Sequence, residues 1–330
     1  MRRLLASLLL ILVLTPATCL RQPLQPATDI ATLRFIPQRL PPKAELARHL
    51  GAFDLEGAWQ MTSPHWRFNG YSALLALGGG ELLAISDRSD LLRFSEPGAP
   101  PRPIEIRPIR SNALSKRYGY DSESATYDPE SGRVWLGWEG SNRISLHGLD
   151  FGPSQTVSPP AMRDWGLNAG PESMVRLTDG RFIVLREGAD GWLDDNHHRA
   201  LLFPDDPLTG KTPEEFTFVG LRGFSPVDAA QLPDGRVLIL MRRLVWPFPV
   251  RFAGRIMIAD PADIRPGENW QAKEVAKLSS SLHVDNFEGM AIEPGDNGRV
   301  IVWLISDANA AITQRTLLWK LTVDPKRLPR

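Results

Sequence analysis

The feature that most constrains this chain is a hairpin unit that recurs along it. In each copy a short strand starts beside an acidic residue, a turn carries Asp-Gly, Ser-Gly or Asn-Gly, and a second strand rich in Val, Ile, Leu and Trp follows. Those dipeptides tolerate the positive φ that tight hairpin turns require. The copies span residues 121–139, 170–187, 226–242 and 286–307, with a weaker copy at 71–87.

A repeated hairpin of this kind predicts an all-β protein, and specifically a β-propeller, in which small sheets are repeated radially and bury a core between them. The 29 Pro and 27 Gly of the chain suit many short strands joined by turns. An additional unit at 53–59 brings the expected number to about six blades. That segment is also expected to close the ring by pairing with 316–323. The only helix-like pattern is one or two turns at 42–50.

The N-terminus has the pattern of a secretory signal. Arg2 and Arg3 precede an apolar run at 4–14 that is too short to span a bilayer, and Pro16 follows it. We therefore expect a signal peptide at 1–19, a Pro-rich extended lead-in at 20–45, and one propeller domain at 46–330 in the periplasm or outside the cell. Two alternatives stay open here, an uncleaved anchor and a lipoprotein acylated at Cys19.

Composition excludes several classes of protein. Lys plus Arg and Asp plus Glu are 38 each, so the basic excess typical of nucleic-acid binding is absent. No second long apolar run exists, so no membrane span is expected once the signal is removed. Cys19 is the only cysteine, which excludes disulfides and thiolate metal sites in the body of the chain.

The hairpin geometry gathers charge at one rim of the ring. If the first strand of each hairpin lines the central channel, the acidic residues at its start converge on one mouth; these are Glu123, Glu172, Asp228 and Glu288. The second strand returns to the same rim, and its end carries Asp87, Glu139, Glu187, Arg242 or Asp307. Gathered carboxylates raise one another's pKa and need cations nearby, either arginines or a metal. The alternative is structural: each carboxylate caps a turn or pairs with an Arg of the next blade.

The units also resemble a known family. The segment 286–292, together with Leu304-Ile-Ser-Asp307 and Gln314-Arg315-Thr-Leu-Leu, is similar to the C-terminal signature of the esterase-like activity of phytase family, or phytase-like domain. Residues 223–226, 232–236 and 71–87 fit the same pattern, and the resemblance covers about 50–323. It implies an exported propeller that hydrolyses phosphoric or other esters. The chain departs from the pattern at Asp228, where a Glu is expected.

Two functions are consistent with these residues. The first is a metal-assisted ester hydrolase of the cell envelope acting on a small-molecule ester or phosphoester. In it, Glu123, Glu172 and Glu288 are catalytic as ligands or general base, Asp87, Asp228 and Asp307 add to a metal site, and Arg186, Arg242 and Arg243 hold the anionic substrate. All-oxygen ligands without cysteine favour Ca²⁺ or Mg²⁺, and we expect Ca²⁺. The second is a non-catalytic propeller that binds a small molecule, glycan or protein at the same mouth.

Overall fold

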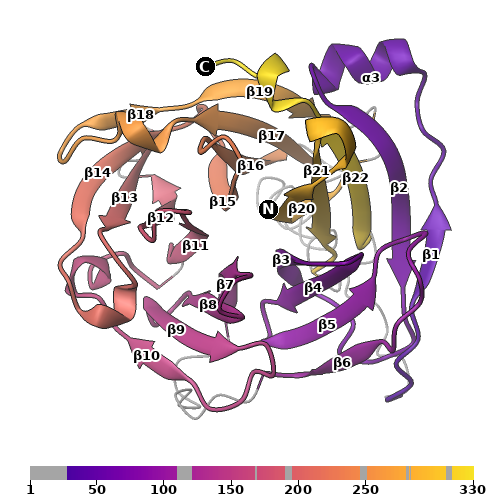
Figure 1. Cartoon of the computed structure of the whole chain (residues 1–330), viewed down its shortest axis with the longest axis horizontal. Coiled ribbons are helices and arrows are strands. Elements are labelled where there is room, and N and C mark those ends of the chain that lie inside the picture. The colour runs from indigo at the N-terminus through magenta and orange to yellow at the C-terminus, as the bar shows by residue number, and fades with distance from the viewer. Residues whose placement is uncertain are drawn as a thin grey trace, which may run out of the picture.

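The strands of this chain form blades arranged around a central axis (Figure 1). The structure is a computed structural model, and it describes residues 28–109, 121–167, 169–189, 195–245, 251–279, 282, 284–309 and 314–330. These residues form five sheets, each one blade of a β-propeller. No helix within them is long and apolar enough to cross a membrane. The expected signal peptide, with Cys19, lies outside the described residues.

The first two blades are four-stranded antiparallel sheets in simple chain order. Blade 1 contains β3 (Tyr71–Gly78), β4 (Glu81–Ser86), β5 (Asp90–Ser95) and β6 (Glu105–Pro108). Blade 2 contains β7 (Ser122–Asp128), β8 (Arg133–Trp138), β9 (Arg143–Gly148) and β10 (Gln155–Val157). In both, each strand pairs with its neighbour in sequence, as the repeated hairpins predict.

In the remaining blades, the strands of a sheet do not all follow one another directly in the sequence. Blade 3 contains β11 (Pro171–Arg176), β12 (Phe182–Ala189), β13 (His197–Phe203) and β14 (Glu214–Val219), with β18 (Asn269–Gln271) added in parallel. Blade 4 contains β15 (Ser225–Gln231), β16 (Val237–Val245), β17 (Arg251–Ala259) and β19 (Lys273–Leu278). Blade 5 contains β20 (Asn286–Pro294), β21 (Val300–Asp307) and β22 (Leu317–Val323), followed by β2 (Asp54–Thr62) and β1 (Arg34–Pro37).

The ring closes where the two ends of the chain meet in blade 5. β2 pairs antiparallel with β22, so the expected closure of 53–59 against the C-terminal segment is confirmed (Figure 1). The same pairing explains why the expectation of about six blades is one too many. The segment counted as an extra unit is the fourth strand of blade 5, and β1 adds a fifth strand beside it from within the expected lead-in.

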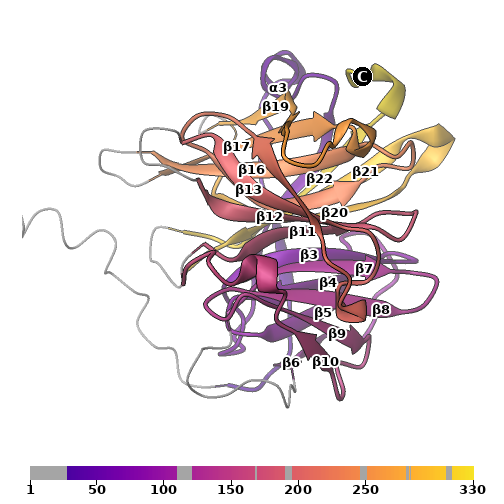
Figure 2. The same cartoon turned by 90° about the vertical axis from the view of Figure 1, so that its left-hand side faces the viewer.

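Among the described residues there is one α-helix, α3 (Lys43–Leu50), which confirms the short helix expected at 42–50. It buries Leu46 and Leu50 and contacts β2 and β19. Seen from the side (Figure 2), the innermost strands lie near the middle of the molecule, and β6, β10 and β19 lie toward its periphery. Buried apolar side chains form a cluster between each pair of neighbouring blades, so the core is distributed around the ring among the described residues.

Each innermost strand starts with a β-bulge. The register shifts by one residue near the start of β3, β7, β11, β15 and β20. The extra residue has no partner across the hairpin, so its side chain is freed from the alternation of the sheet. The residues in this position are Ser72, Glu123, Glu172, Val227 and Glu288.

A small residue usually follows each bulge, because neighbouring innermost strands approach closely there. Ser72 Oγ donates a hydrogen bond to the Ser122 carbonyl at 2.6 Å, and Ser124 Oγ donates one to the Pro171 carbonyl. These bonds join blade 1 to blade 2 and blade 2 to blade 3. At Gly289 a Cβ would lie 2.9 Å from the backbone of Ala73 in the next blade.

Gly289→Ala is therefore expected to lower the free energy of unfolding by about 1–3 kcal/mol, because the added methyl overpacks the contact between β20 and β3. Its Cβ would also lie 2.7 Å from Ile305 Cγ2. Gly148→Ala is the matched control, since the nearest atom to its Cβ is the end of the Asp150 side chain at 3.0 Å. Urea denaturation of both variants checks this, and equal midpoints would show that the strands can separate without cost.

Candidate functional site

One mouth of the central channel is lined by carboxylates from several blades. Backbone hydrogen bonds hold the two ends of each hairpin together at this rim: Asp87 N donates to Gly70 O at 2.7 Å, and Glu139 N donates to Asp121 O at 2.9 Å. In blade 5, Asn286 pairs directly with Asp307. The expectation that strand starts and strand ends share one rim is therefore confirmed.

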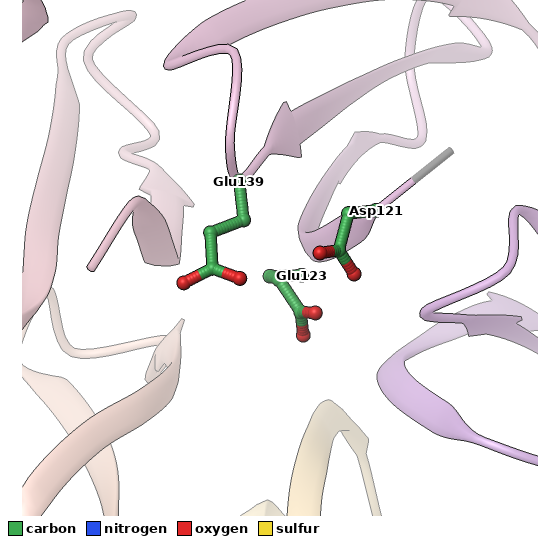
Figure 3. Close-up of side chains that lie close together, drawn as sticks. All are labelled: Asp121, Glu123 and Glu139. Carbon is green, nitrogen blue, oxygen red and sulfur yellow. The ribbon is translucent and has the colours of Figure 1, made fainter. Parts of the chain in front are cut away.

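The carboxylates form two groups that share one member. In the first group, oxygens of Asp121, Glu123 and Glu139 lie within 4.8 Å of one another. Figure 3 shows Asp121 and Glu139 on either side of Glu123, at the end of the β7–β8 hairpin. In the second group, oxygens of Glu139, Glu172 and Glu187 lie within the same distance. Glu139 thus links blade 2 to blade 3.

Arg242 supplies positive charge to one side of this mouth. It reaches in from β16, with Nη2 3.2 Å from Glu187 Oε1 and Nη1 3.2 Å from Glu288 Oε1. Asn286 Nδ2 donates to the same Glu288 oxygen at 2.7 Å. Burial disfavours the charged guanidinium, but the surrounding glutamates outweigh it and raise the pKa of Arg242. Arg242 therefore pairs with Glu187 and Glu288.

The carboxylates on the other side have no such partner. No lysine, arginine or histidine of the described chain forms an ion pair with Asp121, Glu123, Glu139 or Glu172. Burial, followed by the charge of neighbouring carboxylates, raises the pKa of Glu123 and of Glu172 well above the usual range. Burial and the charge of Asp121 raise the pKa of Glu139 to about 7. These groups cannot all be ionised at neutral pH unless a cation joins them.

Asp87 and Asp307 extend the mouth onto blades 1 and 5. Burial raises the pKa of Asp87 to about 6, and the charges of Glu288 and Asp121 add to this effect. Burial and the charge of Glu288 raise the pKa of Asp307 well above its usual range. Both predicted residues therefore lie within electrostatic reach of the mouth, although neither belongs to the two close groups.

Asp228 lies elsewhere, because it is one residue out of phase with the glutamates. The bulge position of β15 is occupied by Val227, and Asp228 follows it. Its Oδ2 accepts a hydrogen bond from Met290 N at 2.6 Å and its Oδ1 accepts one from Ala229 N at 2.8 Å. Asp228 thus connects blade 4 to blade 5, and burial raises its pKa. The structure does not bring its carboxylate to the other acidic residues.

The three predicted arginines are also separated. Arg186 Nε donates to the Trp165 carbonyl at 3.0 Å, and the guanidinium of Arg243 lies over the Phe224 ring, 4.6 Å from its centroid. Arg242 forms ion pairs with Glu187 and Glu288. Sequence reasoning placed Glu139 and Glu187 at the rim without assigning them a role, and it did not single out Asp121. The sequence feature that could have identified these three residues is their position, since each lies at an end of a repeated hairpin.

The chain aligns with several solved structures at low sequence identity. Similar solved structures include an endo-arabinase from Bacteroides thetaiotaomicron (12% identity, TM-score 0.49, covering 76% of this chain and 93% of that one) and a Nidogen/Laminin complex (12% identity, TM-score 0.45, covering 88% and 98%). A protein of unknown function from Dyadobacter fermentans aligns at 11% identity with a TM-score of 0.47, covering 83% and 99%. No curated protein sequence matches this chain.

A family profile gives the clearer result. The profile matches residues 66–310, which runs from the segment before β3 to the end of β21 and includes every carboxylate of the mouth. The resemblance drawn from the hairpin motifs is confirmed by this match. The chain belongs to the phytase-like family, described as esterase-like activity of phytase.

Proposed function

We propose that this protein is an exported, metal-assisted hydrolase of phosphoric esters, with its active site at the carboxylate-lined mouth. The observation that carries the proposal is that four carboxylates on blades 2 and 3 lie close together in two overlapping groups and have no ion-pair partner among the described residues; these are Asp121, Glu123, Glu139 and Glu172. A propeller that used these carboxylates only to fix its blades would pair them with arginines, as Glu187 and Glu288 are paired.

The donor atoms fit a hard divalent cation. All are carboxylate oxygens, which are the ligands of Ca²⁺ and Mg²⁺, and the described chain contributes no thiolate to the site. Asp121, Glu123 and Glu139 would hold the ion, and Glu172 lies in the adjoining group. Like charges within 4.8 Å oppose one another's ionisation, so a bound cation would lower the electrostatic cost of gathering these carboxylates. We propose Ca²⁺ as the ion.

Bound there, the ion would polarise a phosphoryl oxygen and lower the pKa of a water molecule. Proton exchange and positioning of the carboxylates would be supplied by other side chains of the site. Glu172, in the adjoining group, would exchange a proton with water. Arg242 forms ion pairs with Glu187 and Glu288 and holds them in place. In the reaction, water oxygen bonds to phosphorus, the bond between phosphorus and the alcohol oxygen breaks, and the departing alcohol gains a proton.

Hydrolysis of p-nitrophenyl phosphate by the purified mature domain tests this proposal. We expect turnover with Ca²⁺, none with EDTA, and a loss of at least about 100-fold in kcat/KM for Glu123→Gln/Glu172→Gln, because one metal ligand and the proton-exchanging carboxylate are removed. Glu130→Gln is the control, since Glu130 is exposed in the turn at the far end of the β7–β8 hairpin.

Phytate and p-nitrophenyl acetate extend the test to other esters. Background release from every substrate, by a protein that melts cooperatively and binds Ca²⁺, would contradict hydrolysis and favour the propeller as a binding protein. Turnover that survives EDTA and the double substitution would place the active site elsewhere.

A further inference from the structure

A cavity of about 240 Å³ lies in the central channel, away from the acidic mouth. The innermost strands β3, β7, β11, β15 and β20, which surround the central axis (Figure 1), all line it. The acidic residues lie at the starts of these strands, whereas the cavity residues lie toward their ends, at 74–76, 125–127, 175–176, 229–231 and 290–292. Pro129 and Thr178, in the turns after β7 and β11, complete the lining. The cavity therefore belongs to the end of the channel opposite the mouth.

The walls of this cavity are mostly apolar. Blade 1 contributes Leu75, blade 2 contributes Ala125, blade 4 contributes Ala229, and blade 5 contributes Met290. Arg176, on β11 of blade 3, is the one charged residue among the described residues that line it. The volume lies just below the range of sites for drug-sized molecules, so the cavity suits a ligand of a few carbon atoms.

The guanidinium of Arg176 is only weakly engaged by the protein. Its side chain is 22% exposed, and Nη2 lies 3.5 Å from Asp128 Oδ2, which is longer than a charge-assisted hydrogen bond. Asp128 also accepts hydrogen bonds from its own turn, from Ser131 Oγ at 2.6 Å and from Glu130 N at 3.2 Å. Arg176 N donates to Thr126 Oγ1 at 3.0 Å, which fixes the backbone of β11 beside β7. The guanidinium thus keeps donors that can reach a ligand in the cavity.

We propose that this cavity binds a short aliphatic carboxylate, whose charged group pairs with Arg176 and whose hydrocarbon chain lies against the apolar walls. A guanidinium presents two parallel N–H donors that match the two oxygens of a carboxylate. The chain gains from leaving water, whereas a hydrophilic anion such as phosphate would leave the apolar walls unfilled. This inference goes beyond the proposed function and does not depend on it, because it uses none of the carboxylates of the mouth.

Titrations followed by NMR of the ligand, in EDTA, test the cavity apart from any metal at the mouth. Pentanoate, acetate and 1-pentanol separate the contribution of the chain from that of the charge. We expect pentanoate to bind the wild-type protein at least about 10-fold more tightly than acetate, because further methylene groups leave water. It should also bind more tightly than 1-pentanol, because the alcohol lacks the charge that pairs with Arg176. Equal affinities for pentanoate and acetate would overturn the inference.

Arg176→Gln should weaken pentanoate at least about 10-fold and leave 1-pentanol within about 2-fold, because it removes the charge and keeps the apolar walls. Arg181→Gln is the matched control. Arg181 lies in the turn after β11, pairs with Asp179 at 2.8 Å and does not line the cavity. This control should bind pentanoate as the wild-type protein does.

Two further variants locate the ligand. Ala230→Leu keeps Arg176 and narrows the cavity, so it should weaken pentanoate and 1-pentanol by the same factor, and it decides the matter if Arg176→Gln loses both ligands. Unchanged pentanoate affinity in Arg176→Gln and Ala230→Leu would overturn the inference. An affinity that changes in Glu123→Gln/Glu172→Gln and not in Arg176→Gln would place the ligand at the acidic mouth, which also overturns it.

Discussion

Ca²⁺ is expected to raise the melting temperature of this protein by about 5 °C at pH 8 and by much less at pH 5, when present at about 100 times its Kd. The reason is the set of carboxylates whose pKa is raised in the folded state. The pKa of Glu139 rises from 4.5 to about 7, and that of Asp87 from 3.8 to about 6. The folded state therefore favours the protonated forms.

The sign of the pH dependence follows from linkage. Protonated Glu139 and Asp87 contribute stability that is fully present below the unfolded-state pKa, and this stability is lost as the pH rises through the folded-state values of about 7 and about 6. Without metal, the protein should thus lose stability between pH 5 and pH 8. At pH 8 the carboxylates are ionised and bind Ca²⁺ most tightly, whereas at pH 5 protons compete for the same oxygens.

One buried histidine has the opposite effect on the pH dependence of stability. His147 Nε2 lies 2.8 Å from Ser145 Oγ, and burial lowers the pKa of His147 to about 4. Its contribution to stability is lost as the pH falls from 6.5 toward 4. Scanning melts from pH 5 to pH 8, with Ca²⁺ and with EDTA, separate the two effects, because only the carboxylate contribution depends on metal. A shift with Ca²⁺ that is the same at both ends of the range would show that these carboxylates do not hold the ion.

Arg242→Met is expected to lower the free energy of unfolding by about 3 kcal/mol. The substitution keeps most of the side-chain volume and removes the charge that lies 3.2 Å from both Glu187 and Glu288. Those two carboxylates would then be left crowded and uncompensated, which costs more than the ion pairs themselves contribute. Chemical denaturation in EDTA at pH 7.5 measures the change.

Arg243→Met is the matched control, because Arg243 is the next residue, is exposed, and contacts the face of Phe224. Its effect should stay within about 1 kcal/mol. Adding Glu288→Gln to Arg242→Met should recover part of the loss, since one of the uncompensated charges is removed. Equal destabilisation by the two arginine variants, or no recovery in the double variant, would mean that Arg242 acts through packing and not through charge.

Much of the architecture was predictable because each hairpin carries its own turn signal. The repeat predicted radial sheets, and the position of acidic residues at hairpin ends predicted that charge gathers at one rim. The number of blades was harder, since 53–59 resembles a further unit while it pairs as the outer part of blade 5. A strand added from the distant end of the chain has the same local pattern as a strand that starts a new blade.

Which carboxylates reach the mouth depends on shifts of one residue in the register of the innermost strands. Side chains in a strand alternate between faces, so a displacement of one residue changes where a carboxylate points. A bulge places Glu123, Glu172 and Glu288 at the mouth, and Val227 takes that place in blade 4, which moves Asp228 between blades.

The closure of blade 5 also sets an order of events during folding. β1 and β2 are synthesised before the other strands of the ring, whereas β22, the partner of β2, is synthesised after them. Blades 1 to 4 can therefore assemble while the ring is still open, and blade 5 stays incomplete until β22 has been made. A premature stop before Leu317 would leave β2 and β21 with unpaired edges, a state prone to aggregation. Pairing between β2 and β22 thus makes cooperative unfolding of the whole ring depend on two strands that are far apart in the sequence.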